Sequence, residues 1–343
     1  MIKPFFIFIL ILNIIPPFIG ADSLVVVAVG DIMMGTTYPE VWLPPDTGRH
    51  LFESVSSILA VGDLTLGNLE GPLLDGGTCT KILQEGRSYA FRTPPAYAAN
   101  LSAAGFDFLN LANNHLDDFG AAGRDTTFMS LAASGLAWGG PGGRAGRFEV
   151  RGRTVGIVSF SFSAGTNSYF DIPAAQRIVA DEARRSDYVI VCLHGGGEGV
   201  KYMHTPDSFE YFLGWPRGNV VKFARAVVDS GADLVWGHGP HVPRAMEIYR
   251  DRLIAYSLGN FCTWTGFNLD AERRYAPILE AVLDSAGVFV GGRVHSGLQT
   301  PGQYLTIDAE RRAGRLIKRL SEEDFPNSFP IMSEDGAVAP PVK

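Results

Sequence analysis

The amino-acid sequence predicts a globular α/β protein in which helices and sheets are layered. Short runs rich in Val, Ile, Leu and Phe alternate along the chain with helical patterns, and such alternation is typical of layered α/β folds. The chain has 343 residues, of which 46% are hydrophobic and 19% charged, and this composition excludes a disordered or fibrous protein. A chain of this length holds one large domain or two ordinary ones.

Seven apolar runs are predicted to be strands, and each ends in a polar or glycine-rich stretch. In chain order they cover residues 24–29, 64–66, 106–111, 155–160, 188–193, 234–236 and 253–257. In open α/β sheets, ligands bind beyond the carboxyl ends of the strands, because the loops there converge while the strands stay rigid. The sequence therefore predicts a site at this edge of the sheets.

Helical patterns lie between several of these runs. The clearest covers residues 220–230, where Val and Phe side chains form one apolar stripe, Asn219 can cap the start and Gly231 the end. Shorter patterns at 95–104 and 128–134 are each followed by a glycine in the same way. These segments are predicted to cover the sheets.

The first 21 residues are predicted to be an export signal or an N-terminal anchor. Lys3 precedes an apolar run at 5–15, and the small residues Gly20 and Ala21 come just before polar ones. The run is short for a membrane span, which needs about 20 apolar residues. We therefore expect an exported protein, located in the periplasm, at the cell surface or outside the cell, with membrane contact only through this segment.

The rest of the chain is predicted to form one domain over residues 22–320. From 321 to 343 the composition becomes rich in Pro, Ser and Glu, which predicts a peripheral C-terminal tail. The net charge of -7 and the absence of any Lys or Arg run argue against nucleic acid as a partner. Three scattered cysteines do not provide a disulfide framework.

Carboxylate, amide and imidazole side chains follow the predicted strands directly. They are Asp31, Glu70, Asn114, His115, His194, His238 and His241. Neutral imidazoles and oxygen ligands on rigid elements suit one or two divalent ions of borderline hardness, such as Zn²⁺, Mn²⁺ or Fe. Each residue alone also fits a structural role, but the set favours a metal site. The other histidines, His50, His204 and His295, are expected to be structural.

The motifs around these residues resemble those of a known family. They are Gly30-Asp31-Ile32-Met33, Asn68-Leu69-Glu70, Ala112-Asn113-Asn114-His115 with Asp118 and Gly120, His194 with Glu198, Gly231-Ala232-Asp233 running to Gly237-His238-Gly239-Pro240-His241, and Tyr256-Ser257-Leu258-Gly259-Asn260-Phe261. Over residues 25–263 they resemble the CapA family of capsule and poly-γ-glutamate synthesis proteins. That family is similar to the calcineurin-like metallophosphoesterases, so the resemblance implies a four-layer αββα sandwich with a two-metal centre at the strand ends.

The resemblance also implies ligand roles. Asp31 and His241 would hold the first metal, Glu70 would bridge, and Asn114, His194 and His238 would complete the second. Met33 stands where the wider superfamily has a histidine, and the closing motif has two residues between His238 and His241 instead of one. We therefore expect one firm metal site and one that is weak or absent.

Catalytic and substrate-binding roles are expected for five further residues. His115 would be the general acid, Asp118 would orient it, and Glu198 would act as a partner or a second acid. Arg92 and Arg244 are the candidates to bind an anionic group. The substrate would be an anionic polymer or a phosphorylated or glutamyl compound, cleaved at a phosphoester or γ-glutamyl amide bond, and the capsule-synthesis machinery is a further partner implied by the resemblance.

A non-catalytic protein is the alternative that the sequence leaves open. Loss of the histidine at Met33 is also consistent with a degenerate metallophosphatase-like fold that binds, exports or retains a surface polymer without cleaving it.

Overall fold

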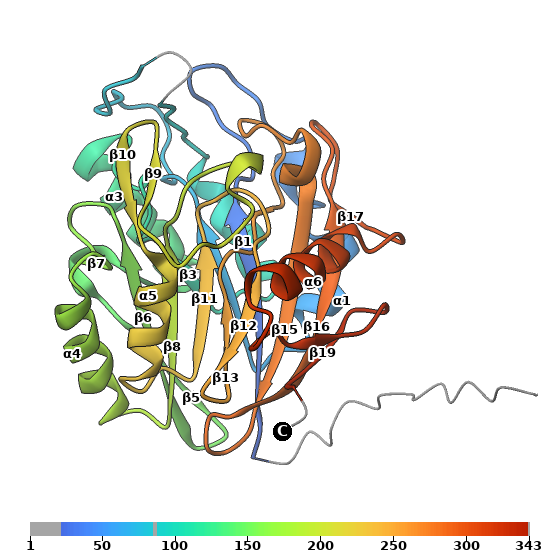
Figure 1. The fold of residues 1–343 in the computed structure, drawn as a ribbon. Helices are drawn as coiled ribbons and strands as arrows, with labels where there is room; N and C mark the ends of the chain where they lie inside the picture. Colours follow the sequence, from blue (N-terminus) through green and yellow to red (C-terminus); the bar gives the residue numbers. More distant parts are fainter. Residues whose placement is uncertain (1–21, 85–87, 342–343) are drawn as a thin grey trace, which may run out of the picture.

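The computed structural model of the protein describes residues 22–84 and 88–341, and two β-sheets packed face to face form its centre (Figure 1). The first sheet has ten strands, in which β1 to β4 run parallel. Its strands are β1 (Leu24–Ile32), β2 (Leu64–Leu69), β3 (Phe108–Asn110), β4 (Ala137–Gly139), β14 (Asn260–Phe261), β15 (Tyr275–Leu283), β16 (Phe289–Leu298), β17 (Thr306–Ile307), β18 (Ile331–Met332) and β19 (Ala337–Ala339).

The second sheet has seven strands, and its central strands β6, β8, β11 and β13 run parallel. Its strands are β5 (Gly146–Val150), β6 (Arg153–Ser161), β7 (Asn167–Ser168), β8 (Tyr188–His194), β11 (Leu234–His238), β12 (Met246–Tyr249) and β13 (Arg252–Ala255). A separate two-stranded hairpin, β9 (Glu210–Phe212) and β10 (Trp215–Gly218), stands near the upper end of the strands in Figure 1.

Helices cover the outer faces of both sheets. On the first sheet lie α1 (Ser56–Leu59), α2 (Ala98–Ala103) and α3 (Gly120–Ala133), and on the second α4 (Ile172–Ala183) and α5 (Val220–Val228). A further helix, α6 (Arg312–Asp324), packs against β12, β15 and β16. The 3-10 helices are η1 (Asp46–Gly48), η2 (Glu53–Val55), η3 (Pro95–Tyr97), η4 (Pro141–Gly143), η5 (Val200–Tyr202) and η6 (Ala271–Arg274).

Three apolar cores separate these layers. Between the sheets, Val26 of the first packs with Trp236 of the second. Leu131 belongs to the core under α1 to α3, and Phe223 to the core under α4 and α5. The prediction of a four-layer αββα sandwich is thus confirmed. Because the parallel strands of each sheet are buried on both faces, their sequences are continuous apolar runs.

The C-terminal boundary differs from the prediction. Residues 321–341 are not a peripheral tail: β19 pairs with β16 at the edge of the first sheet, and β18 pairs with β19. The side chains of Met332 and Val338 lie in the core between the sheets, and the buried Ser321 accepts a hydrogen bond from the Met246 amide at 2.8 Å. Alternation within two short strands buries these few apolar side chains although the segment as a whole is polar.

The predicted export signal at 1–21 lies outside the described residues. Within the ranges 22–84 and 88–341, no helix has the length and apolar character needed to cross a bilayer. The three cysteines are free thiols, as expected from their spacing.

Candidate metal centre

The carboxyl ends of strands from both sheets meet at one place. Asp31 lies at the end of β1, and Glu70 comes just after the adjacent strand β2. In the second sheet, His194 ends β8 and His238 ends β11, and the register of these parallel strands pairs the two histidines. Side chains from four separate strands therefore converge between the two sheets.

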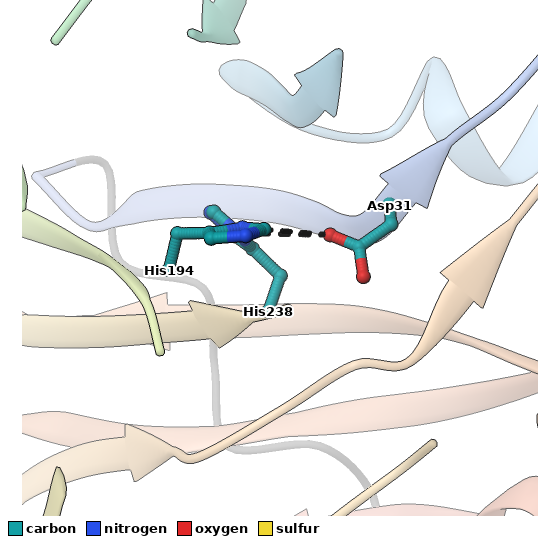
Figure 2. Close-up of side chains that lie close together, drawn as sticks. All are labelled: Asp31, His194 and His238. Atoms are coloured by element: carbon teal, nitrogen blue, oxygen red, sulfur yellow. Dashed lines mark hydrogen bonds and ion pairs between the residues drawn. The ribbon is translucent and has the colours of Figure 1, made fainter. Parts of the chain in front are cut away.

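Asp31, His194 and His238 form the centre of this group (Figure 2). The Nδ1 atoms of the two histidines lie 3.0 Å apart. Asp31 Oδ1 lies 3.7 Å from Nδ1 of His238 and 4.0 Å from Nδ1 of His194. All three side chains are buried, and one ligand atom from each lies within 4.8 Å of the others. Donor atoms bound to one zinc-sized ion at about 2.1 Å would be separated by roughly 3 to 4 Å.

Glu70 and Asn114 lie at the other nitrogen of His194. Asn114 Oδ1 is 2.9 Å and Glu70 Oε1 is 3.8 Å from Nε2 of that ring. Glu70 Oε1 is buried and has no hydrogen-bond donor among the described residues. Leaving a buried carboxylate oxygen without a partner is costly, and a cation would satisfy it. The donor set of carboxylates, imidazoles and an amide thus fits a divalent ion.

His194 limits how many ions this donor set can hold. A neutral imidazole offers a lone pair at one nitrogen while the other carries the proton. Asp31 and His238 face its Nδ1, whereas Glu70 and Asn114 face its Nε2. The neutral ring can therefore bind an ion on one side only. The predicted second-site ligands and Asp31 all lie around this ring, on its two sides.

His241 lies on the far side of Asp31. Its Nδ1 is 3.0 Å from Asp31 Oδ2 and 3.0 Å from Asn260 Oδ1. The turn that brings it there has φ +105° at Gly239 and φ +58° at His241, and the Gly239 amide donates to Asp31 at 3.1 Å. A side chain at Gly239 would lie 3.1 Å from the His194 ring in addition to the unfavourable φ. Asp31 and His241, expected as ligands of the first metal, are thus neighbours, and here they pair directly with each other.

The charge states of these groups follow from burial and pairing. Burial acts to raise the pKa of Asp31, but the hydrogen bond and charge of His241 outweigh it, so this pKa is lowered. For His241, burial acts to lower the pKa, but Asp31 outweighs burial and raises it to about 9. Burial lowers the pKa of His238 to about 3 and that of His194 well below its ordinary value. These last two imidazoles are therefore neutral, the form that binds metals.

His115 stands beside this group with its own partners. Its Nδ1 is 2.8 Å from Asp118 Oδ2, so Asp118 can orient the ring. Lys81 Nζ lies 2.8 Å from Asp118 Oδ1 and 3.1 Å from Nδ1 of His115. Nε2 is 4.0 Å from Glu70 Oε1. Burial lowers the pKa of His115, and the charge of Asp118 partly offsets this effect.

An open cleft leads to these side chains. It consists of two adjoining hollows of about 500 and 460 Å³, both lined by Tyr89, His115, Glu198 and Phe212. Asn114 lines one hollow and His241 the other. A ligand in the cleft would therefore reach His115, Glu198 and the edge of the candidate metal centre.

Comparison with known proteins identifies the family of this chain. Residues 25–264 match the model of the bacterial capsule synthesis protein PGA_cap family. The chain belongs to the PGA_cap family. The capsule biosynthesis protein CapA of Bacillus anthracis is 30% identical over 70% of this chain and 60% of its own length. The PGA biosynthesis protein CapA of Bacillus subtilis (strain 168) is 31% identical over 68% of this chain and 61% of its own length.

Each match thus spans about three fifths of the curated relative, 60% and 61%. The predicted resemblance to the CapA family is confirmed. Among solved structures, a putative 5'-nucleotidase from Staphylococcus aureus aligns with a TM-score of 0.49 at 16% identity, covering 88% of this chain and 58% of the other.

In this PGA_cap chain, neither arginine predicted to bind substrate is available to a ligand. Arg244 is fully buried and forms a bidentate ion pair with Glu210 at 2.8 and 3.0 Å. Arg92 lies over the Phe119 ring and donates to the Thr37 hydroxyl at 2.8 Å, and also to nearby backbone carbonyls. The prediction for Arg244 is wrong, because its buried guanidinium joins segments of the protein instead.

Sequence reasoning missed both arginines that line the cleft, Arg273 in the first hollow and Arg217 in the second. Arg217 is the one beside His115 and Asn114. It lines the second hollow, and its Nη2 donates to Glu198 Oε1 at 2.8 Å. Glu198 therefore lies in the cleft as expected, but as the partner of an arginine. No local sequence pattern marks Arg217, since Glu198 is 19 residues away.

Buried amides of the PGA_cap chain under the carboxylates were also missed as functional residues. Asn68 donates to Asp31 at 2.7 Å and to Glu70 at 2.5 Å. Its own oxygen accepts from Asn110 at 2.8 Å and from Asn113 at 3.1 Å. Strand alternation could have indicated Asn68, because residues two apart, such as Asn68 and Glu70, share one face. These amides fix the directions of both carboxylates.

Proposed function

We propose that this chain is an exported accessory protein of capsule or poly-γ-glutamate synthesis and that its cleft holds a metal-dependent hydrolase centre. The observation that carries this proposal is the convergence of Asp31, His194 and His238 beside an unpartnered oxygen of Glu70. Clustered ligands of this kind at the base of an open cleft are typical of hydrolytic metal sites. Family membership supports the assignment to capsule synthesis.

Asp31, His238 and Nδ1 of His194 would hold the ion. Asn114 would accept the Nε2 proton of His194, with Glu70 on the same side of the ring. Mn²⁺, Zn²⁺ and Fe are the ions that suit this mixture of nitrogen and oxygen donors. When bound, such an ion supplies a Lewis acid and lowers the pKa of water in the site. Asn68 keeps both carboxylates directed toward the centre through its two hydrogen bonds.

His115 is the residue of the chain placed to move a proton. Asp118 accepts from its Nδ1, which leaves Nε2 for a group in the cleft. Because burial lowers the pKa of His115, the ring would take up its second proton when an anionic ligand binds, and would then give its Nε2 proton to the leaving group of a phosphoester or γ-glutamyl amide. Lys81 balances the charge of Asp118, which it contacts at 2.8 Å. The aromatic side chains of the cleft would exclude water from this transfer.

A non-catalytic polymer-binding, export or retention protein is the second candidate. One observation favours it: Met33 stands where the wider superfamily has a histidine. Such a protein would keep the cleft and bind its polymer there without turnover.

Metal analysis combined with a hydrolase screen tests these proposals. The full chain and three variants, His115→Ala, His238→Ala and His50→Ala, would be purified under mild conditions and assayed with Mn²⁺ or Zn²⁺. Substrates would be phosphodiesters, phosphomonoesters and γ-linked glutamyl peptides. His50 is the matched control, because it is a half-exposed histidine that pairs with Glu53 outside the cleft.

We expect the wild-type protein and His50→Ala to retain metal and turnover. His238→Ala should lose both, whereas His115→Ala should keep its metal but lose turnover by roughly 10²- to 10⁴-fold. Turnover that survives in His115→Ala contradicts its acid role. A metal-free wild-type protein contradicts the metal centre, and saturable polymer binding without turnover supports the second candidate.

A further inference from the structure

The β9–β10 hairpin presents Arg217 to the cleft. Within this hairpin Pro216 pairs with Tyr211 and Gly218 pairs with Glu210, so Arg217 is an extra residue on β10. An extra residue of this kind, a β-bulge, bends the strand and changes the direction of its side chain. Here the Arg217 side chain lines the hollow that also contains His115 and Asn114.

Two buried contacts hold the hairpin against the second sheet. Glu210, at the start of β9, forms the bidentate ion pair with Arg244, which lies between β11 and β12. The buried hydroxyl of Tyr169 donates to the backbone carbonyl of Arg217 itself. The position of Arg217 is therefore fixed by contacts that involve neither its guanidinium nor any ligand.

Aromatic rings enclose the guanidinium. Its central carbon lies 4.2 Å from the ring centre of Phe162 and 5.4 Å from that of Phe212. Only 10% of the side chain is exposed. Stacking against the rings keeps the guanidinium plane in place and excludes water, and both effects strengthen its pairing with an anion.

The guanidinium has more donors than partners. It carries five N–H groups, and among the described residues its one hydrogen bond is from Nη2 to Glu198. Nε is buried and has no acceptor. Lys81, in the same hollow, already contacts Asp118, His115 and the Asn114 carbonyl. Arg273 lines the other hollow, which Asn114 does not line.

We propose that Arg217 is the anion-binding residue of this site and takes an oxyanion group, phosphate or carboxylate, of the ligand that lies beside the metal centre. The proposal rests on the proposed function for the identity of that centre. A planar guanidinium can donate to two oxygens of one oxyanion, whereas a lysine ammonium cannot match this geometry. Glu198 keeps the guanidinium in place when no ligand is bound.

Binding of small oxyanions tests this role directly. Inorganic phosphate and γ-glutamylglutamate would be titrated separately into the full chain by calorimetry, with and without Mn²⁺. The variants are Arg217→Met, which keeps an apolar stem between the rings, and Arg217→Lys, which keeps the charge. Arg250→Met is the matched control. Arg250 lies at the β12–β13 turn, over the Tyr249 ring at 5.7 Å, and pairs with Asp229 at 2.9 Å.

We expect Arg217→Met to weaken binding of at least one of the two anions by about ten- to a hundredfold. Arg217→Lys should lose less, and Arg250→Met should bind as the wild type does. The anion that shows the loss identifies the ligand class. Circular dichroism and thermal unfolding should match those of the wild type, because the hairpin is held by other residues.

Three results overturn the proposal: Arg217→Met binds both anions with wild-type affinity, Arg250→Met loses as much affinity as Arg217→Met, or the wild type binds neither anion. The titrations without Mn²⁺ separate this proposal from the proposed function. Arg217-dependent anion binding in a protein that takes no metal leaves the anion site standing and removes the metal centre. Metal-dependent turnover combined with wild-type anion binding by Arg217→Met leaves the metal centre standing and removes the anion site.

Discussion

At the scale of single residues, Asp31 and Glu70 show how two buried carboxylates can differ. Burial favours the protonated form of both, but His241 stabilises the charge of Asp31 through a 3.0 Å contact, and the pKa of Asp31 is lowered. Glu70 has no such partner, and burial together with the charge of Asp31 raises its pKa well above the usual value. A divalent cation between them would supply the charge that Glu70 lacks. The chain thus keeps Asp31 charged without an ion, whereas the charge of Glu70 would depend on one.

A buried carboxyl away from the centre gives a stability prediction at the same scale. Burial raises the pKa of Asp233, at the start of β11, to about 6, although it accepts a hydrogen bond from the Val189 amide at 2.8 Å and pairs with Arg252 at 3.1 Å. A raised pKa means that the folded state holds the proton more tightly than the unfolded state, whose Asp pKa is about 3.9. The contribution of Asp233 to stability is therefore largest below pH 4 and is lost as pH rises through about 6.

Asp233→Asn should remove this pH dependence. An amide keeps the hydrogen bond from Val189 but does not titrate, so the wild type should lose roughly 2 to 3 kcal/mol relative to Asp233→Asn between pH 4 and pH 7. Urea unfolding of both proteins across this range measures the difference. A constant difference at all pH values would show that the carboxyl titrates normally.

At the scale of elements, the β9–β10 hairpin depends on a buried ion pair. Arg244 is fully buried and Glu210 nearly so, and their bidentate contact joins the hairpin to the loop between β11 and β12. Arg244 also donates to the Gly197 carbonyl at 2.9 Å, in the loop that carries Glu198. One ion pair therefore supports both residues that meet in the cleft, Arg217 and Glu198.

Breaking this pair should be strongly destabilising. Arg244→Met leaves the Glu210 carboxylate buried without its cation, with the Gly197 amide still donating to it, and should cost about 3 to 5 kcal/mol. The double variant Arg244→Met/Glu210→Gln should recover part of that loss. Denaturant unfolding of the wild type, both single variants and the double variant gives the coupling energy. Strictly additive losses in this cycle would contradict the direct pairing.

The elements also show what sequence patterns could predict. The helix predicted at 220–230 is α5, and Asn219 caps it by accepting from the Lys222 amide at 2.8 Å. The strands that carry the site were predictable, because each is buried on both faces and is directly followed by its polar ligand. The β15–β16 hairpin was not predicted, since half-buried residues such as Glu280 and Arg293 interrupt its apolar pattern.

Within the site, the sequence did not predict the directions in which side chains point. Asp31, Glu70, His194 and His238 could be predicted, because the ends of parallel strands meet at one edge. Arg217 and Arg244 could not be told apart in this way. One is directed into the cleft by a bulge and the other is buried by a partner 34 residues away, and neither cause is visible locally.

At the scale of the whole molecule, the site depends on two sheets that hold their strands in fixed positions. The core between the sheets is completed by the C-terminal segment, where Met332 and Val338 pack with side chains of β15, β16 and α6. β19 also pairs with the edge strand β16 at Gly292 and Arg293. The polar C-terminal segment therefore stabilises a sandwich whose site lies at the ends of other strands, β1, β2, β8 and β11.

Ending the chain after Pro330 tests this division between stability and function. The truncation removes β18 and β19, opens the core at Met332 and Val338 and removes the pairing of β19 with Gly292 and Arg293 of β16, so the free energy of unfolding should fall by about 2 to 5 kcal/mol. A chain that ends after Pro340 keeps both strands and should unfold like the wild type. Metal content of the folded protein should be the same in all three, because no ligand of the candidate centre lies beyond residue 241.

Urea unfolding at 10 °C, paired with metal analysis, measures both quantities. Equal stability of the Pro330 truncation and the wild type would mean that the two strands only lie against the sandwich, and loss of metal at unchanged stability would mean that they act on the site.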